Sequence, residues 1–241
     1  MPRRRVVVLL VLLAMPAPNA RAQTDLDTAF EVRYGLFHIA DVTLAAHQDP
    51  SAYRVTGVVT SAGLVRYVRD FHFDLSVEGG HDGVVFRPAH YVGDMDTGRR
   101  QVQVEMLYPQ DTPEILRIAP EEPTGPWTIA AADQTGAVDP LTALYRVIRP
   151  RLRDELCGWA VDLFDGRRRS RLTLDPAQPR GDTITCVGAY QRVAGYAPAE
   201  LADYTALPFA LVFQPDTGDE WHLTRMVTQT PYGRMRIVRT H

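Results

Sequence analysis

The residues that could carry out chemistry in this chain are limited in type, because all 26 basic residues are arginine and no lysine is present. Schiff-base catalysis, a phosphate-binding P-loop and a Ser–Lys pair all require lysine, so the sequence excludes them. The segment Ser61-Ala62-Gly63 comes nearest to a nucleophile elbow, but Val59 stands where the leading glycine is needed. We therefore predict no catalytic nucleophile.

Three histidines, His72, His81 and His90, lie nine residues apart, a spacing that invites a metal-site interpretation. An odd step along a continuous strand places successive side chains on opposite faces. Solvent-facing or hydrogen-bonded histidines are the simpler interpretation, and we predict no metal and no cofactor. A pair of carboxylates acting as acid and base stays open, since a sequence does not show which Asp and Glu side chains converge.

One local concentration of positive charge follows the turn at Asp165-Gly166. Arg167, Arg168 and Arg169 are candidates for binding an anion or a phosphate group, because guanidinium groups form paired hydrogen bonds with such groups. The alternative is a solvated run of charge that protects a hairpin tip or a sheet edge.

The two cysteines, Cys157 and Cys186, have only each other as partners. In an oxidising compartment a lone pair is expected to form a disulfide. Two buried thiols or a redox pair are the alternatives, although the Cys-x-x-Cys spacing typical of redox pairs is absent.

The first 22 residues have the pattern of a secretory signal peptide. Arginines at positions 3–5 precede an apolar stretch from Val6 to Met15, and Ala20 and Ala22 supply the small residues for cleavage after Ala22. This stretch is shorter than the roughly 20 apolar residues that span a bilayer, so no transmembrane anchor is expected after cleavage. We predict a signal peptide over residues 1–22 and a single β-rich periplasmic domain over residues 23–241.

The net charge of the exported part limits the classes of molecule that it is expected to bind. Without the four arginines of residues 1–22, its 22 basic residues are outnumbered by 29 acidic residues, a formal charge of −7. Nucleic acids and anionic membranes both attract a basic surface. We therefore expect neither nucleic acid nor an anionic membrane to be the main partner.

The elements that must position these residues are mostly strands. Apolar side chains alternate with polar ones over Phe71, Phe73, Leu75 and Val77, and again over Val102, Val104 and Met106, which is typical of half-buried strands. About ten to twelve such segments are joined by connections too short for crossover helices, which predicts an antiparallel meander. Five prolines between Pro109 and Trp127 favour an irregular strap there.

One helix is predicted from about Leu141 to Arg149. Asp139 is a good N-cap, Pro140 suits the first turn, and the apolar residues have helical spacing. These apolar residues are Leu141, Leu144, Tyr145 and Ile148. A second short helical piece is predicted around Leu152 and Leu156. The expected fold is mainly β: a single curled antiparallel sheet, open or closed like a barrel, with one or two short helices packed on it.

Several short segments together resemble an exported bacterial family, domain of unknown function 3108. They are Tyr34-Gly35-Leu36, Asp139-Pro140-Leu141-Thr142-Ala143-Leu144, Phe164-Asp165-Gly166-Arg167-Arg168-Arg169, Cys186 with Tyr190 and Val193-Ala194-Gly195-Tyr196, and Thr230-Pro231-Tyr232-Gly233. The resemblance implies a Gram-negative envelope protein and carries no catalytic residues with it. The meander with a helical insert is also similar in architecture to the curled open barrels of periplasmic lipoprotein carriers.

These patterns favour a non-enzymatic protein of the cell envelope. Its concave sheet face is expected to bind an apolar or lipid-like ligand, or to dock an envelope protein. The alternatives are an interaction or structural module without a ligand, and an enzyme of unrecognised type that acts on glycans or lipids.

Overall fold

The computed structural model describes residues 24–216, 218–230 and 233–240. The predicted signal peptide and its cleavage site after Ala22 lie outside the described residues, so both stay predictions.

The first half of the chain is a meander of long strands. These are β1 (Thr24–Tyr34), β2 (Phe37–Gln48), β3 (Ala52–Ser61), β4 (His72–His81), β5 (Phe86–Asp96), β6 (Gln101–Leu107) and β7 (Glu114–Ala119). A short helix, α1 (Val65–Val68), interrupts it between β3 and β4. The prediction of an irregular strap is wrong for β7. The prolines of this segment lie outside β7, which forms an edge of the sheet, where an unpaired side is tolerated.

The second half carries the main helix and shorter strands. The helices are α2 (Pro140–Ile148) and α3 (Pro198–Asp203), with single 3₁₀ turns at Pro109–Asp111, Ala131–Asp133 and Arg153–Glu155. The strands are β8 (Arg151–Leu152), β9 (Ala160–Phe164), β10 (Arg169–Leu174), β11 (Gln178–Arg180), β12 (Thr183–Ala194), β13 (Ala206–Pro215), β14 (Glu220–Thr230) and β15 (Gly233–Arg239).

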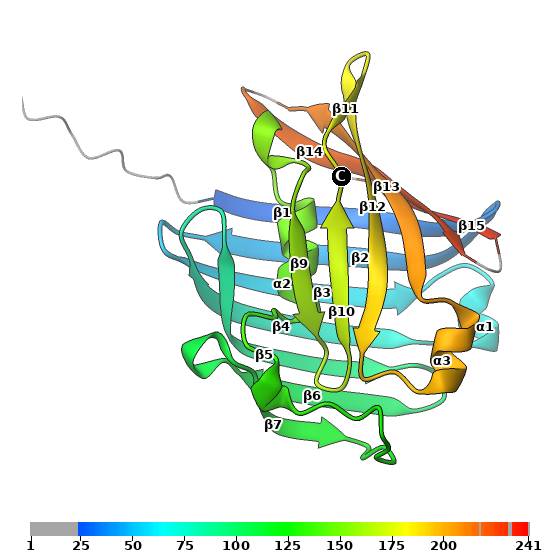
Figure 1. Cartoon of the computed structure of the whole chain (residues 1–241). Coiled ribbons are helices and arrows are strands. Elements are labelled where there is room, and N and C mark those ends of the chain that lie inside the picture. The colour runs from blue at the N-terminus through cyan, green and yellow to red at the C-terminus, as the bar shows by residue number, and fades with distance from the viewer. Residues whose placement is uncertain (1–23, 217, 231–232, 241) are drawn as a thin grey trace, which may run out of the picture.

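All of these strands belong to one antiparallel sheet, in the order β7-β6-β5-β4-β3-β2-β1-β15-β14-β13-β12-β10-β9, with β8 on β14 and β11 on β12. The predicted fold class is confirmed, and the sheet is open because β7 and β9 form its two edges in the described chain. The sheet curls, so that β9, β10 and β12 run across the strands of the first half (Figure 1). Because the sheet curls, its apolar face is buried against other strands of the same sheet. A flat sheet of this size would leave that face exposed.

Helix α2 lies inside this curl, between β9 and the first-half strands (Figure 1). The predicted helix is confirmed with its boundaries one residue earlier, and Asp139 is its N-cap. Leu141, Tyr145 and Ile148 are buried as predicted, but Leu144 is only partly buried. Because sheet strands contact the helix on several sides, its burial extends beyond one stripe to Thr142, Ala143 and Val147.

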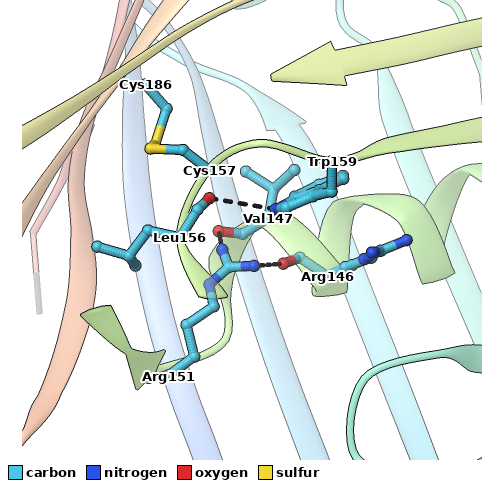
Figure 2. Close-up of a disulfide and its surroundings, with 7 residues drawn as sticks. All are labelled: Arg146, Val147, Arg151, Leu156, Cys157, Trp159 and Cys186. Atoms are coloured by element: carbon cyan, nitrogen blue, oxygen red, sulfur yellow. Dashed lines mark hydrogen bonds between the residues drawn. A yellow bond between two sulfur atoms is a disulfide. The ribbon is translucent and has the colours of Figure 1, made fainter. Parts of the chain in front are cut away.

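The second helical piece predicted near Leu152 and Leu156 is limited to one 3₁₀ turn, Arg153–Glu155. The chain forms β8 and a single 3₁₀ turn there, since Arg151 turns back and donates hydrogen bonds to the last carbonyls of α2 (Figure 2). The helix is thus capped by a side chain instead of being continued.

The predicted disulfide between Cys157 and Cys186 is confirmed, with the two Cα atoms 5.5 Å apart. It joins the loop after α2 to β12, and the Cys186 side chain is fully buried. Beside it, the Trp159 indole donates a hydrogen bond to the Leu156 carbonyl (Figure 2). The disulfide therefore holds the helix-bearing segment against the second half of the sheet.

Candidate functional site: an apolar groove beside the arginine turn

Three rows of side chains cross β4, β5 and β6 on the concave face. The strand register places Phe73, Met95 and Val102 side by side in the first row. The second row contains Leu75, Gly93 and Val104, and the third contains Val77, Tyr91 and Met106. The third row is buried beneath the rest of the fold, whereas Phe73, Met95 and Val102 are only half-buried. The apolar face predicted from strand alternation is therefore real, and one end of it is left partly open.

Gly93 lies in the middle of this face and leaves room there for the Tyr91 ring. It has no side chain between Leu75 and Val104, and a Cβ atom at this position would lie 2.8 Å from the Tyr91 hydroxyl. The Tyr91 ring therefore packs over the glycine and also lines the hollow described next. A residue with a side chain would displace it.

The β9–β10 turn forms the opposite wall. Gly166 adopts a positive φ of 96°, which favours glycine. A Cβ atom there would lie 3.1 Å from side-chain carbons of both Ile118 and Val104. Glycine therefore lets the turn approach β6 and β7 closely. We call the hollow between the turn and the three strands the concave groove; its volume is about 300 Å³. Its apolar lining is Phe73, Leu75, Tyr91, Met95, Val102, Val104 and Pro140, and its polar rim is Thr97, Arg100, Asp165, Arg167 and Arg168.

The structure places Arg167 and Arg168 at this groove, but not Arg169. Glu122, on the segment after β7, forms ion pairs with three arginines. The N–O distances are 2.6 Å to Arg167, 3.6 Å to Arg168 and 3.0 Å to Arg100. Arg168 also pairs with Glu200 at 2.9 Å. Three guanidinium groups therefore surround a single carboxylate at the rim. Whether they also bind an anion stays a prediction.

Arg169 points elsewhere and shares Asp162 with Arg171, at N–O distances of 2.5 and 2.6 Å. Arg167 and Arg168 belong to the β9–β10 turn, whereas Arg169 is the first residue of β10 and lies opposite Phe164 of β9. A run of arginines in sequence thus divides between two different sites.

Two buried carboxylates lie near the groove, and both are engaged by backbone amides. Asp139 is fully buried and accepts hydrogen bonds from the Thr142 amide (2.9 Å) and hydroxyl (2.5 Å). Asp165 accepts from the amides of Arg167 and Arg168, and burial raises its pKa. These contacts cap a helix and a turn. The arrangement favours a structural role for both carboxylates over an acid–base pair.

Burial raises the pKa of Asp139 from 3.8 to about 6. A folded-state pKa above the unfolded value means that the folded protein binds the extra proton, so this contribution to stability is present below about pH 4 and is lost as the pH rises through 6. Asn keeps the cap but does not ionise. We expect Asp139→Asn, relative to the wild type, to gain about 2–3 kcal/mol of unfolding free energy between pH 4 and pH 7. Urea unfolding at each pH measures this.

Asp162→Asn is the matched control for this experiment. Hydrogen bonds from Arg171 and then Arg169 lower the pKa of Asp162, so its contribution to stability is lost as the pH falls. The two variants should therefore change the pH profile in opposite directions. Parallel profiles for the wild type and Asp139→Asn would contradict the assignment.

The three evenly spaced histidines do not converge. His72 pairs with Asp74, and His90 pairs with Glu105. His81 is buried and contacts the Asp49 carbonyl. Among the described residues, no group of three or more His, Cys, Asp or Glu side chains has the arrangement of a metal site.

Other hollows occur in the described chain, and one of about 300 Å³ shares Arg167 with the concave groove and is lined by Ile115, Ile118 and Trp127 among others. Another, of about 430 Å³, is lined by His47, Arg54 and Glu78 among others, with the two charged side chains paired at 2.8 Å. Another, about 380 Å³, is lined by Tyr108, Arg146 and Asp162 among others. The Tyr108 hydroxyl there has no hydrogen-bond partner in the described structure, and burial raises its pKa. The hollow of about 430 Å³ is lined largely by charged and polar side chains, whereas that of about 380 Å³ has apolar lining that includes Phe86, Val138 and Val161, beside Arg87 and Arg146.

Sequence reasoning missed three parts of the site. Glu122 lies in a proline-rich segment with no regular pattern, and Gly93 is a single glycine within a strand. The contribution of Arg100 depends on the curl of the sheet. The glycine carried a usable signal, since an isolated glycine in a strand marks a close approach of another group. The other two carried none.

Fold and groove together define a class of protein: an open, curled antiparallel sheet with a groove on its concave face. The chain belongs to the family described as protein of unknown function (DUF3108), whose model matches residues 29–206. The resemblance seen in the sequence is thereby confirmed. No protein of curated function matches the chain.

A solved structure similar to this chain is the crystal structure of a β-barrel-like protein of domain of unknown function DUF1849 from Brucella abortus. The two are 12% identical, with a TM-score of 0.49 over 89% of this chain and 95% of the other. Separately, no helix among the described residues is long and apolar enough to cross a membrane.

Proposed function

We propose that this protein is a non-enzymatic binding protein of the cell envelope that holds an acyl chain or a similar apolar ligand in the concave groove. The observation that carries the proposal is the half-buried row of Phe73, Met95 and Val102, which faces a hollow of about 300 Å³. Apolar surface left in water costs roughly 25 cal/mol per Å². A ligand that covers this row recovers that free energy.

The size and rim of the groove suggest the kind of ligand. A hollow of about 300 Å³ is at the small end of ligand sites, so it suits a single acyl chain better than a whole diacyl lipid. Arg100 and Arg168 line the rim, where an anionic head group such as a carboxylate or a phosphate would compete with Glu122 for their guanidinium groups. We therefore favour a fatty acid or another singly acylated molecule.

The disulfide supports a location outside the cytoplasm, because structural disulfides persist mainly in oxidising compartments. Together with the predicted signal peptide, it favours the periplasm. The same groove would serve an interaction module if the apolar row docked a protein side chain instead of a ligand, and the experiment below separates these alternatives.

Titration with a fluorescent fatty acid tests the proposal. The wild type should bind the probe saturably, and Met95→Glu should weaken binding at least about tenfold, since it places a charge in the apolar row. Val92→Glu is the matched control, because Val92 lies on the same strand but on the opposite face. Absence of saturable binding by the wild type, or equal losses in both variants, would favour the interaction module.

A further inference from the structure

Five large apolar side chains project into solvent at one end of the sheet. Leu36 lies in the β1–β2 turn and Phe37 is the first residue of β2; they are 89% and 65% exposed. Leu64, Tyr67 and Val68 occupy α1 and the position before it, with exposures of 71%, 85% and 90%. We call these five residues the rim patch. Isolated exposed apolar residues are ordinary, but a cluster exposed to this degree marks a surface that another phase or molecule covers.

Backbone contacts hold the two parts of the rim patch close together. The Ala62 amide donates a 3.0 Å hydrogen bond to the Ile39 carbonyl. A Cβ atom on Gly63 would lie 2.5 Å from the His38 carbonyl oxygen. The segment leading into α1 therefore lies against the start of β2, next to Phe37. Figure 1 shows α1 and the β1–β2 turn at the same end of the sheet.

Arginines flank the rim patch on both sides. Arg66 and Arg69 lie on and after α1, and neither pairs with a carboxylate among the described residues. Arg234, at the start of β15, has an exposed side chain. Its backbone carbonyl accepts a hydrogen bond from the Gly35 amide. The Arg236 guanidinium donates to the Gly35 carbonyl at 2.8 Å. This arrangement fits a phospholipid surface, because the apolar side chains can contact the acyl region while the guanidinium groups contact the phosphates.

We propose that the rim patch docks on a phospholipid bilayer, with the apolar side chains inserted between head groups and the arginines on the lipid phosphates. The side chains protrude from a turn and a four-residue helix. The shape of the patch therefore favours a deformable lipid surface over a second copy of the chain.

The net charge of −7 expected for the exported part determines what kind of membrane binding follows. That charge repels an anionic bilayer as a whole, whereas the arginines act only locally, within about a Debye length. Insertion of the apolar side chains must therefore supply most of the affinity. Binding should survive physiological salt and should require the rim patch.

The concave groove opens next to the rim patch. Arg69, which follows α1, donates a 2.9 Å hydrogen bond to the Thr97 carbonyl in the β5–β6 turn. Thr97 and Arg100 of that turn line the rim of the groove. A bilayer held by the rim patch would lie beside the mouth of the groove, so an acyl chain could pass between them without crossing water. This last step rests on the proposed function, whereas docking itself does not.

Flotation with phosphatidylcholine–phosphatidylglycerol vesicles tests docking. The wild type should float with the vesicles. Leu36→Ser/Phe37→Ser and Tyr67→Ser/Val68→Ser should each reduce binding about tenfold or more, because each pair of substitutions removes apolar surface that insertion would bury. Val84→Ser/Leu152→Ser is the matched control. Both residues are exposed, at 56% and 52%, and lie at the opposite end of the sheet, so this variant should float like the wild type.

Three results would overturn docking: a wild type that binds no vesicles, equal losses in the control, or concentration-dependent dimerisation that the rim-patch variants abolish. Titration of the soluble fatty-acid probe without vesicles separates this proposal from the proposed function. A rim-patch variant that retains probe binding but no longer floats would support docking as a distinct property. A protein that floats but binds no probe would leave docking intact and remove the ligand proposal.

Discussion

Replacing Tyr145 with alanine should lower the free energy of unfolding by about 3–5 kcal/mol, the range for removing a large buried aromatic side chain. Tyr145 is 2% exposed and lies where α2 meets the first half of the sheet. Its ring stacks on Tyr53 with centroids 6.0 Å apart and meets the edge of Phe86 at 5.4 Å. Its hydroxyl donates a 2.8 Å hydrogen bond to Gln48. Urea unfolding followed by circular dichroism measures the loss.

Two control variants make this test specific. Tyr145→Phe keeps the ring and removes only the hydrogen bond, so it should cost about 1 kcal/mol. Tyr67→Ala removes a tyrosine that is 85% exposed and should change stability by less than about 0.5 kcal/mol. If all three variants unfolded at the same urea concentration as the wild type, α2 would not be part of the core.

Removing the disulfide by the double substitution Cys157→Ala/Cys186→Ala should cost about 3–4 kcal/mol. The two cysteines are 29 residues apart, and the bond limits the conformations of the unfolded chain by closing a loop of that length. The loss of the fully buried Cys186 sulfur adds a small packing defect. Equilibrium unfolding of the oxidised protein and the double variant measures the difference.

Reduction of the wild type provides the independent comparison. Reductant should destabilise the wild type by a similar amount and should leave the double variant unchanged. A wild type whose unfolding midpoint does not respond to reductant would show that the bond contributes little to stability, and the chain-entropy account would fail.

Much of the architecture follows from local sequence patterns. Alternation over Phe73, Leu75 and Val102 specifies strands with one apolar face, because the period of a strand is two residues. Asp139 followed by Pro140 specifies the start of α2, because the cap and the first-turn proline satisfy local backbone geometry. The disulfide needed only the count of two cysteines. These predictions depend on a few neighbouring residues or on composition, which a sequence displays directly.

The short helices and the candidate site depended on contacts between distant segments. Helices α1 and α3 contain four and six residues, too few to show a periodic pattern. The curl of the sheet brings Glu122 to Arg167, 45 positions further along the chain, and it surrounds α2 with strands. It also leaves the Phe73–Met95–Val102 row half-covered. The sequence by itself determined which faces are apolar. Only the tertiary structure decided which part of that surface stays open, because curvature is set by the combined packing of all the strands.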